Sequence, residues 1–155
     1  MARSLRRFPH AAPLLFLSLL IVLMSLPDGS HFLQLLTPTV SASTTFTVNS
    51  IGDGADSNLA DGVCNDGTGA CTLRAAIQQA NADTGAEIVT FAPALTSGGP
   101  ATIALLSALP DLSSDMTING PGANLLAVQR STAGGTPDFR IFSINSGIFV
   151  TLSGQ

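Results

Sequence analysis

Short runs of alternating hydrophobic and polar residues make up most of the chain after residue 43. In TTFTVNS (44–50), threonine alternates with Phe46 and Val48, which is the period of a half-buried β-strand. Six further runs have β-type composition, and glycine or proline separates most of them. These runs are EIVTF (87–91), ATIALL (101–106), DMTING (115–120), LLAVQ (125–129), RIFSI (140–144) and IFVTLSG (148–154). The pattern predicts a mainly β fold.

One segment, CTLRAAIQQAN (71–81), has the period of a helix instead. Its predicted cap residues are the N-cap Thr72, the apolar Leu73 and Ile77, and the polar Arg74 and Asn81. Leu73, Ile77 and Ala80 fall at i, i+4 and i+7, so they form one narrow apolar face, with Arg74, Gln78 and Asn81 on the other side. We expect a short amphipathic helix over about residues 72–82. A helix of about ten residues is marginal alone and must pack on something.

The segment 1–42 has the pattern of a secretory signal peptide. Arg3, Arg6 and Arg7 precede a charge-free apolar run at 11–26, and VSA (40–42) offers small residues for cleavage after Ala42. The alternative is an uncleaved membrane anchor, although the run is shorter than the ~20 residues that span a bilayer comfortably. The prediction is a secreted or cell-surface product, with membrane contact only through this segment if it is uncleaved.

Removal of the leader changes the charge balance. The remainder has three arginines and neither lysine nor histidine, against eight aspartates and Glu87, which gives a formal net charge of −6. Nucleic acids are therefore excluded as partners, because affinity for phosphate comes from Lys and Arg.

The two cysteines, Cys64 and Cys71, both lie after the leader. In an oxidising compartment a disulfide is the favoured interpretation, and a loop this short contributes roughly 2–3 kcal/mol in the chain-entropy model. A metal site is the alternative, but two cysteines without histidine fall short of a zinc set.

The loop between residues 51 and 70 is rich in oxygen-bearing side chains. Calcium is the candidate cofactor, because hard cations take several oxygen ligands from flexible loops. The other interpretation is a turn-rich loop in which Asp and Asn bond to nearby backbone groups. No further cofactor is predicted. The candidate ligands are Asp53, Asp56, Asn58, Asp61 and Asp66.

A short motif recurs as TVNS (47–50), TING (117–120) and SINS (143–146). The spacing of the last two copies is near the length of one turn of a solenoid. In a parallel β-helix each coil stacks on the last, so that inward aliphatic residues form a continuous core. The end of such a coil is an unpaired sheet edge, which the helix at 72–82 is placed to cover.

The stretch CTLRAAIQQAN resembles the CSLREAI…AN signature of the CSLREA domain, and the resemblance extends over Thr45–Val128. It implies an exported bacterial surface or extracellular protein with a right-handed parallel β-helix of the pectin-lyase-like kind. Ala75 stands where the family has Glu, which removes the reciprocal carboxylate of a capping box. The expected organisation is a signal peptide (1–42), a CSLREA-type capping region (43–91) and the first, incomplete coils of a β-helix (92–155).

Two classes of function follow. The first is a structural or adhesive module without catalysis in this chain, whose faces engage glycans or other surface proteins. The second is an N-terminal fragment of a β-helix polysaccharide lyase or glycoside hydrolase. Arg130, Asp138 and Arg140 lie close in sequence, but no His, Lys or Tyr remains after the leader to act as a base. We therefore expect a non-enzymatic module, in which Arg74 bonds loop carbonyls near the cap.

Overall fold

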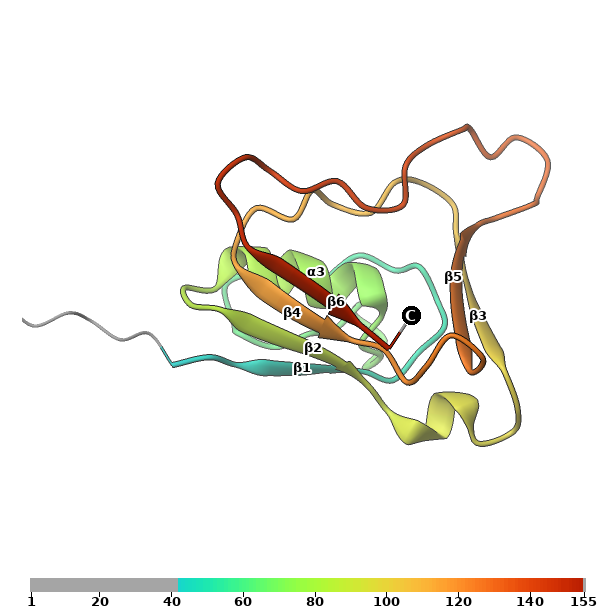
Figure 1. The fold of residues 1–155 in the computed structure, drawn as a ribbon, viewed down its shortest axis with the longest axis horizontal. Coiled ribbons are helices and arrows are strands. Elements are labelled where there is room, and N and C mark those ends of the chain that lie inside the picture. The colour runs from blue at the N-terminus through green and yellow to red at the C-terminus, as the bar shows by residue number, and fades with distance from the viewer. Residues whose placement is uncertain (1–41, 155) are drawn as a thin grey trace, which may run out of the picture. The chain divides into compact units, whose positions relative to one another are not determined.

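Parallel strands form two sheets in the part of the chain described by the computed structural model, residues 42–154. The larger sheet has the order β1-β2-β4-β6 and the smaller one pairs β3 with β5, and every pairing is parallel. In Figure 1 the four strands of the larger sheet run side by side, with α3 behind them. The elements are β1 (Thr45–Val48), α3 (Leu73–Ala82), β2 (Glu87–Phe91), the 3-10 helix η1 (Pro93–Thr96), β3 (Ala101–Leu105), β4 (Met116–Asn119), β5 (Leu126–Arg130) and β6 (Val150–Ser153). The described residues are thus mainly β with one α-helix, as predicted.

The chain passes through both sheets twice after α3. Each pass leaves the larger sheet, adds a strand to the smaller sheet, and returns to the larger sheet through a third parallel pairing, the bridge between Leu112 and Ile144. Ile88 pairs with Thr117 at the end of the first pass, and Thr117 pairs with Thr151 at the end of the second. The second pass is longer because more of the chain separates β5 from Ile144 than separates β3 from Leu112.

The strand register contradicts two expectations from sequence. SINS (143–146) does not align with TING (117–120), because β4 pairs with β6 and Asn119 therefore lies opposite Ser153. RIFSI (140–144) forms no strand, and Ile144 makes only the isolated bridge to Leu112. The reason is the long excursion after β5, which makes the second pass longer than the spacing between the two motifs. Aligned polar side chains do bond across strands, but between Asn119 and Ser153, 2.7 Å apart.

Alternation along the strands builds the core. Phe46, Val89 and Ile118 occupy matching positions in β1, β2 and β4, and all three are buried. Ile103 and Leu105 supply the buried face of β3 in the same way. Full burial of each such side chain contributes about 1.5–3 kcal/mol. The inward residues of successive strands therefore form one continuous hydrophobic cluster.

The helix α3 packs against β1 and β2. It buries more of its surface than the narrow apolar face predicted from the sequence. Leu73 and Ile77 are fully buried, as expected, but so are Ala75, Ala76 and Gln79. The small alanine side chains let the helix lie close to its neighbours. It ends at Ala82, and the N–H of Asp83 still donates to Gln79 O at 3.0 Å.

The predicted leader lies outside the described residues, except for Ala42. Within residues 42–154, no helix combines the length and the hydrophobicity that crossing a membrane requires.

The substitution Ile77→Ala should lower the free energy of unfolding by about 2–5 kcal/mol, because it leaves a cavity between α3 and the sheet. Ile51→Ala is the matched control, since Ile51 is 51% exposed, and its effect should stay within about 0.5 kcal/mol. Denaturant unfolding of both variants measures the difference. Equal losses would show that α3 does not depend on this packing.

Candidate functional site

The residues predicted to cap the sheet do converge in space. We use the term cap for residues 49–83, which comprise the loop after β1 and α3. The disulfide between Cys64 and Cys71 closes this loop, and the two Cα atoms lie 5.1 Å apart. Cys71 also connects the loop to β1, because its N–H donates to Asn49 Oδ1 at 2.8 Å and its carbonyl accepts from Asn49 N at 2.9 Å. The two bonds between Asn49 and Cys71 therefore hold the start of α3 beside the end of β1, and the disulfide ties Cys64 to the same place.

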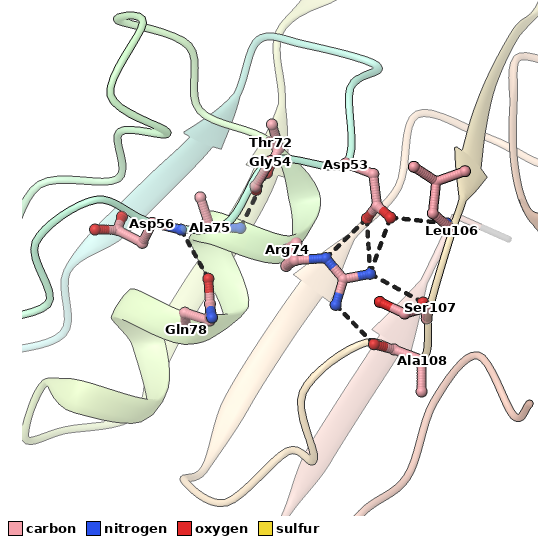
Figure 2. Close-up of polar contacts among 10 residues, drawn as sticks. All are labelled: Asp53, Gly54, Asp56, Thr72, Arg74, Ala75, Gln78, Leu106, Ser107 and Ala108. Atoms are coloured by element: carbon pink, nitrogen blue, oxygen red, sulfur yellow. Dashed lines mark hydrogen bonds and ion pairs between the residues drawn. The ribbon is translucent and has the colours of Figure 1, made fainter.

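Thr72 is the N-cap of α3. Its Oγ1 accepts from Ala75 N at 3.0 Å and donates to Gly54 O at 2.6 Å, as Figure 2 shows. The threonine is fully buried, so its N-cap hydrogen bond is shielded from water. Ala75, where the CSLREA signature has Glu, is buried as well. One hydroxyl thus joins the helix start to the loop at Gly54 without a reciprocal carboxylate.

Arg74 is the centre of the polar contacts between the cap and the chain that follows β3. Its Nη1 donates to Ala108 O at 2.6 Å and its Nη2 to Ser107 O at 2.9 Å, which are loop carbonyls of the kind expected from sequence. Its Nε and Nη2 also bind both carboxylate oxygens of Asp53, at 2.9 and 3.0 Å. Figure 2 shows these bonds radiating from the guanidinium. Such bidentate contacts are geometrically specific as well as strong.

Asp53, a candidate calcium ligand by sequence, is the partner of Arg74. The side chains of Arg74 and Asp53 are 11% and 8% exposed, so water screens the pair only weakly. Asp53 Oδ2 also accepts from Leu106 N at 2.8 Å. The carboxylate and the guanidinium together bond one N–H and two carbonyls in the chain that follows β3.

Asn81 completes the cap on the side of the Leu112 bridge. Its Nδ2 donates to Asp111 O at 2.8 Å and its Oδ1 accepts from Ser113 N at 2.9 Å. Leu112 makes its backbone bonds on the opposite side: its N–H donates to Ser143 O, and its carbonyl accepts from Asn145 N. In a parallel ladder alternate residues bond to opposite neighbours. The carboxamide of Asn81 therefore occupies the place of a peptide group from a preceding strand.

The other four candidate calcium ligands bond within their own loop. Asp56, Asn58, Asp61 and Asp66 each accept from a backbone N–H two residues ahead. These are the local turn bonds of the alternative interpretation. In the described range, no three or more His, Cys, Asp or Glu side chains are grouped so as to hold a metal. Calcium binding stays a prediction.

The pKa of Asp66 lies below the ordinary value of an aspartate. The hydroxyl of Thr68, at 2.6 Å from Oδ1, lowers the pKa of Asp66 below its ordinary value, and backbone N–H groups of Thr68 and Ala70 act in the same direction. The carboxylate is only partly shielded from solvent, so its bonds stabilise the loop at the surface.

A groove of about 340 Å³ lies between β1 and the part of the loop that carries the disulfide. None of the residues that line it carries an ionisable acid or base, so the groove offers no general acid or base. The lining residues are Thr44, Thr45, Phe46, Thr47, Asn49, Gly62, Val63, Cys64 and Cys71.

The charged trio spans the end of β5 and the excursion after it: Arg130 is the last residue of β5, and Asp138 and Arg140 lie in the excursion. Arg130 Nη2 lies 3.4 Å from Asp138 Oδ1, and the carboxylate is 97% exposed. Arg130 also donates to Thr136 O at 2.9 Å, and Arg140 is exposed. These contacts fold the loop on itself, and exposed pairs of this kind contribute little to stability.

Two buried polar residues were missed by the sequence patterns. Gln79 lies outside the apolar stripe of α3, yet it is fully buried and its Nε2 donates to Asp83 Oδ1 at 2.9 Å. Glu87 is 1% exposed at the start of β2. The period of EIVTF was the available signal, because it puts Glu87 on the same face as the buried Val89.

Comparison with protein-family models, with curated proteins and with solved structures finds no match for this chain.

We expect Asn81→Ala to lower the free energy of unfolding by about 1 kcal/mol, because Asp111 O and Ser113 N lose the partner that replaces a strand. Amide exchange at Ser113 should also become faster. Asn124→Ala is the matched control, since Asn124 is exposed, and it should change stability by less than about 0.5 kcal/mol. Unchanged protection at Ser113 would contradict the strand-replacing role of Asn81.

The lowered pKa of Asp66 predicts that its contribution to the stability of the fold is lost at low pH. Its contribution to stability is present above the ordinary Asp pKa of about 3.9 and is lost as the pH falls through the lower folded-state pKa. Thr68→Val removes the hydroxyl donor and should raise the pKa of Asp66 toward its ordinary value. NMR titration of the carboxyl carbon measures the shift, with Thr132→Val, at an exposed position, as the control. An unmoved Asp66 titration in Thr68→Val would exclude the hydroxyl as the cause.

Proposed function

We propose that this chain is the N-terminal part of an exported bacterial protein with a right-handed parallel β-helix, and that it serves a structural or adhesive role at the cell surface or outside the cell. The observation that carries the proposal is the repeated pass through three parallel pairings. β2 and β4, β3 and β5, and Leu112 and Ile144 each lie one pass apart. A chain that adds one strand to every ladder per pass is the elementary unit of a solenoid.

The stacking of side chains supports the same architecture. Phe46, Val89 and Ile118 continue one another inside the larger sheet, as the core of a β-helix requires. Thr47 Oγ1 and Thr90 Oγ1 lie 3.2 Å apart on the opposite face. Connections between parallel strands of one sheet are right-handed in the great majority of proteins, which is the basis for the proposed hand.

The cap favours an N-terminal position in such a helix. An open end of a parallel ladder presents unpaired backbone groups to solvent and to other chains. Here Asp53 and Arg74 bond the backbone after β3, and Asn81 bonds the backbone around Leu112. The cap thus supplies hydrogen-bond partners to the first pass at two of its three parallel pairings, after β3 and around Leu112. This agrees with the resemblance of CTLRAAIQQAN to the CSLREA signature.

Export is supported by the cysteine chemistry and by the leader pattern. The Cys64–Cys71 disulfide suits an oxidising compartment. Residues 1–42 have the basic and apolar succession of a signal peptide with cleavage after Ala42. The product then acts outside the cytoplasm, on the surface or in the medium.

We favour a binding role over the lyase or hydrolase alternative because charged side chains that catalysis would need are paired with one another in structural contacts. Arg74 and Asp53 are engaged in the cap, and Arg130, at the end of β5, pairs with the exposed Asp138 of the following loop. Outward residues such as Thr102 and Thr151 leave polar, uncharged faces on the strands. Faces of this kind suit hydrogen bonding to glycans or to other surface proteins.

The intact mass of the exported product tests the proposal. We expect a mass that matches Ser43–Gln155 and no reaction with a thiol alkylating reagent until the protein is reduced, when two alkyl groups are added. The variant Cys71→Ser is the control, because its single remaining thiol should react without reduction. A retained leader, or two reactive thiols in the unreduced product, would contradict export with a structural disulfide.

A further inference from the structure

Glu87 is a buried carboxylate with an unused oxygen. The side chain is 1% exposed at the first position of β2. Its Oε2 accepts a hydrogen bond from Thr44 N, whereas Oε1 has no partner among the residues that the structure describes. A buried carboxylate that keeps one oxygen unpaired is costly, because it has given up water without full replacement. The position therefore calls for a further donor or a cation.

The arginines of the described range with assigned partners are engaged elsewhere. Arg74 binds Asp53, Arg130 binds Asp138, and the whole chain contains no lysine. Arg140, the remaining arginine of the described range, is exposed, whereas Glu87 is buried. We therefore look for the cation of Glu87 in another chemical group.

The N-terminal end of β1 brings such a group close. Thr44 N donates to Glu87, and Thr44 O accepts from Ile88 N at 2.9 Å. Ser43, one residue earlier, donates through Oγ to Ala86 O at 2.5 Å. Neighbouring backbone nitrogens are less than about 4 Å apart, so the nitrogen of Ser43 lies within about 4 Å of the Thr44 nitrogen that is bonded to the carboxylate. That nitrogen belongs to the bond predicted to be cleaved.

We propose that Glu87 binds the α-ammonium group of Ser43 once the leader has been removed after Ala42. This inference rests on the export and processing in the proposed function. In the cleavage step an endopeptidase adds water across the Ala42–Ser43 amide. The C–N bond breaks, Ala42 keeps the new carboxylate, and Ser43 keeps the amine, which takes up a proton.

The ion pair makes the folded state sensitive to processing. In the precursor, Ser43 offers a neutral amide, and Glu87 keeps an unpaired oxygen in the interior. In the product, the ammonium supplies charge and up to three donors at the same place. Cleavage thereby strengthens the docking of β1 on β2, so that the fold is completed after export.

The absence of lysine gives a direct test, because the α-amine is then the only primary amine of the processed product. We would follow its acetylation by an amine-reactive ester with mass spectrometry, in the native product and in denaturant at one pH. The expected native rate is slower by about tenfold or more, as a charge-assisted hydrogen bond can produce. Glu87→Gln should bring the native rate to within about twofold of the unfolded rate.

Asp138→Asn is the matched control for the loss of one negative charge, because Asp138 is 97% exposed, and it should retain the protection. A second variant keeps Glu87 and inserts one glycine between Ala42 and Ser43, which moves the amine by one residue. Its native amine should react as in the unfolded chain, so the inference remains testable if Glu87→Gln does not fold.

The outcomes separate this inference from the proposed function. A correct mass for Ser43–Gln155 with an amine that reacts equally fast in the native and unfolded states overturns the ion pair and leaves export intact. Cleavage at another bond also overturns only the ion pair. A retained leader overturns both. Protection that is lost in Glu87→Gln and in the glycine insertion, but kept in Asp138→Asn, supports the ion pair.

Discussion

The ion pair between Arg74 and Asp53 joins three parts of the chain that are distant in sequence. Arg74 belongs to α3, Asp53 to the loop after β1, and both bond the backbone at residues 106–108. Both side chains are largely shielded from water, so each charge depends on the other. The pair therefore ties α3 and the loop after β1 to the chain that follows β3, in addition to the apolar packing of α3 on β1 and β2.

The cap can cover the start of the parallel ladder because its polar side chains supply the hydrogen bonds that a preceding strand would make. A parallel ladder leaves the outer backbone groups of its first strand unpaired, and buried or partly buried groups of this kind need partners. A carboxamide carries the same donor and acceptor as a peptide group. Asn81 uses both around Leu112, and Asp53 supplies an acceptor for Leu106 N. A helix whose own backbone bonds are satisfied internally can thus begin a β structure.

Polar side-chain contacts attach β1 at both of its ends, in addition to the backbone bonds of the sheet. At its start, Thr44 N bonds to Glu87, and after its end Asn49 exchanges bonds with Cys71. The second attachment involves Cys71, which is also bound to Cys64 by a disulfide, a bond typical of oxidising compartments. The first is completed, in our proposal, by the ammonium group that processing creates. In our proposal, both attachments link the finished fold to export.

Local physics in the sequence predicted strands within 44–50, 87–91, 101–106 and 115–120, a helix with Thr72 as N-cap, and a Cys64–Cys71 disulfide in preference to a metal site. The structure has strands at 45–48, 87–91, 101–105 and 116–119, that helix and that disulfide. Alternation, capping chemistry and short loops act between neighbours in the chain. Only the tertiary structure decided the strand register, in which Asn119 lies opposite Ser153, because the excursion after β5 changes the spacing without changing any motif. It also decided the partners of Arg74, Asn81 and Glu87, since a side chain's distant neighbours depend on how the passes stack.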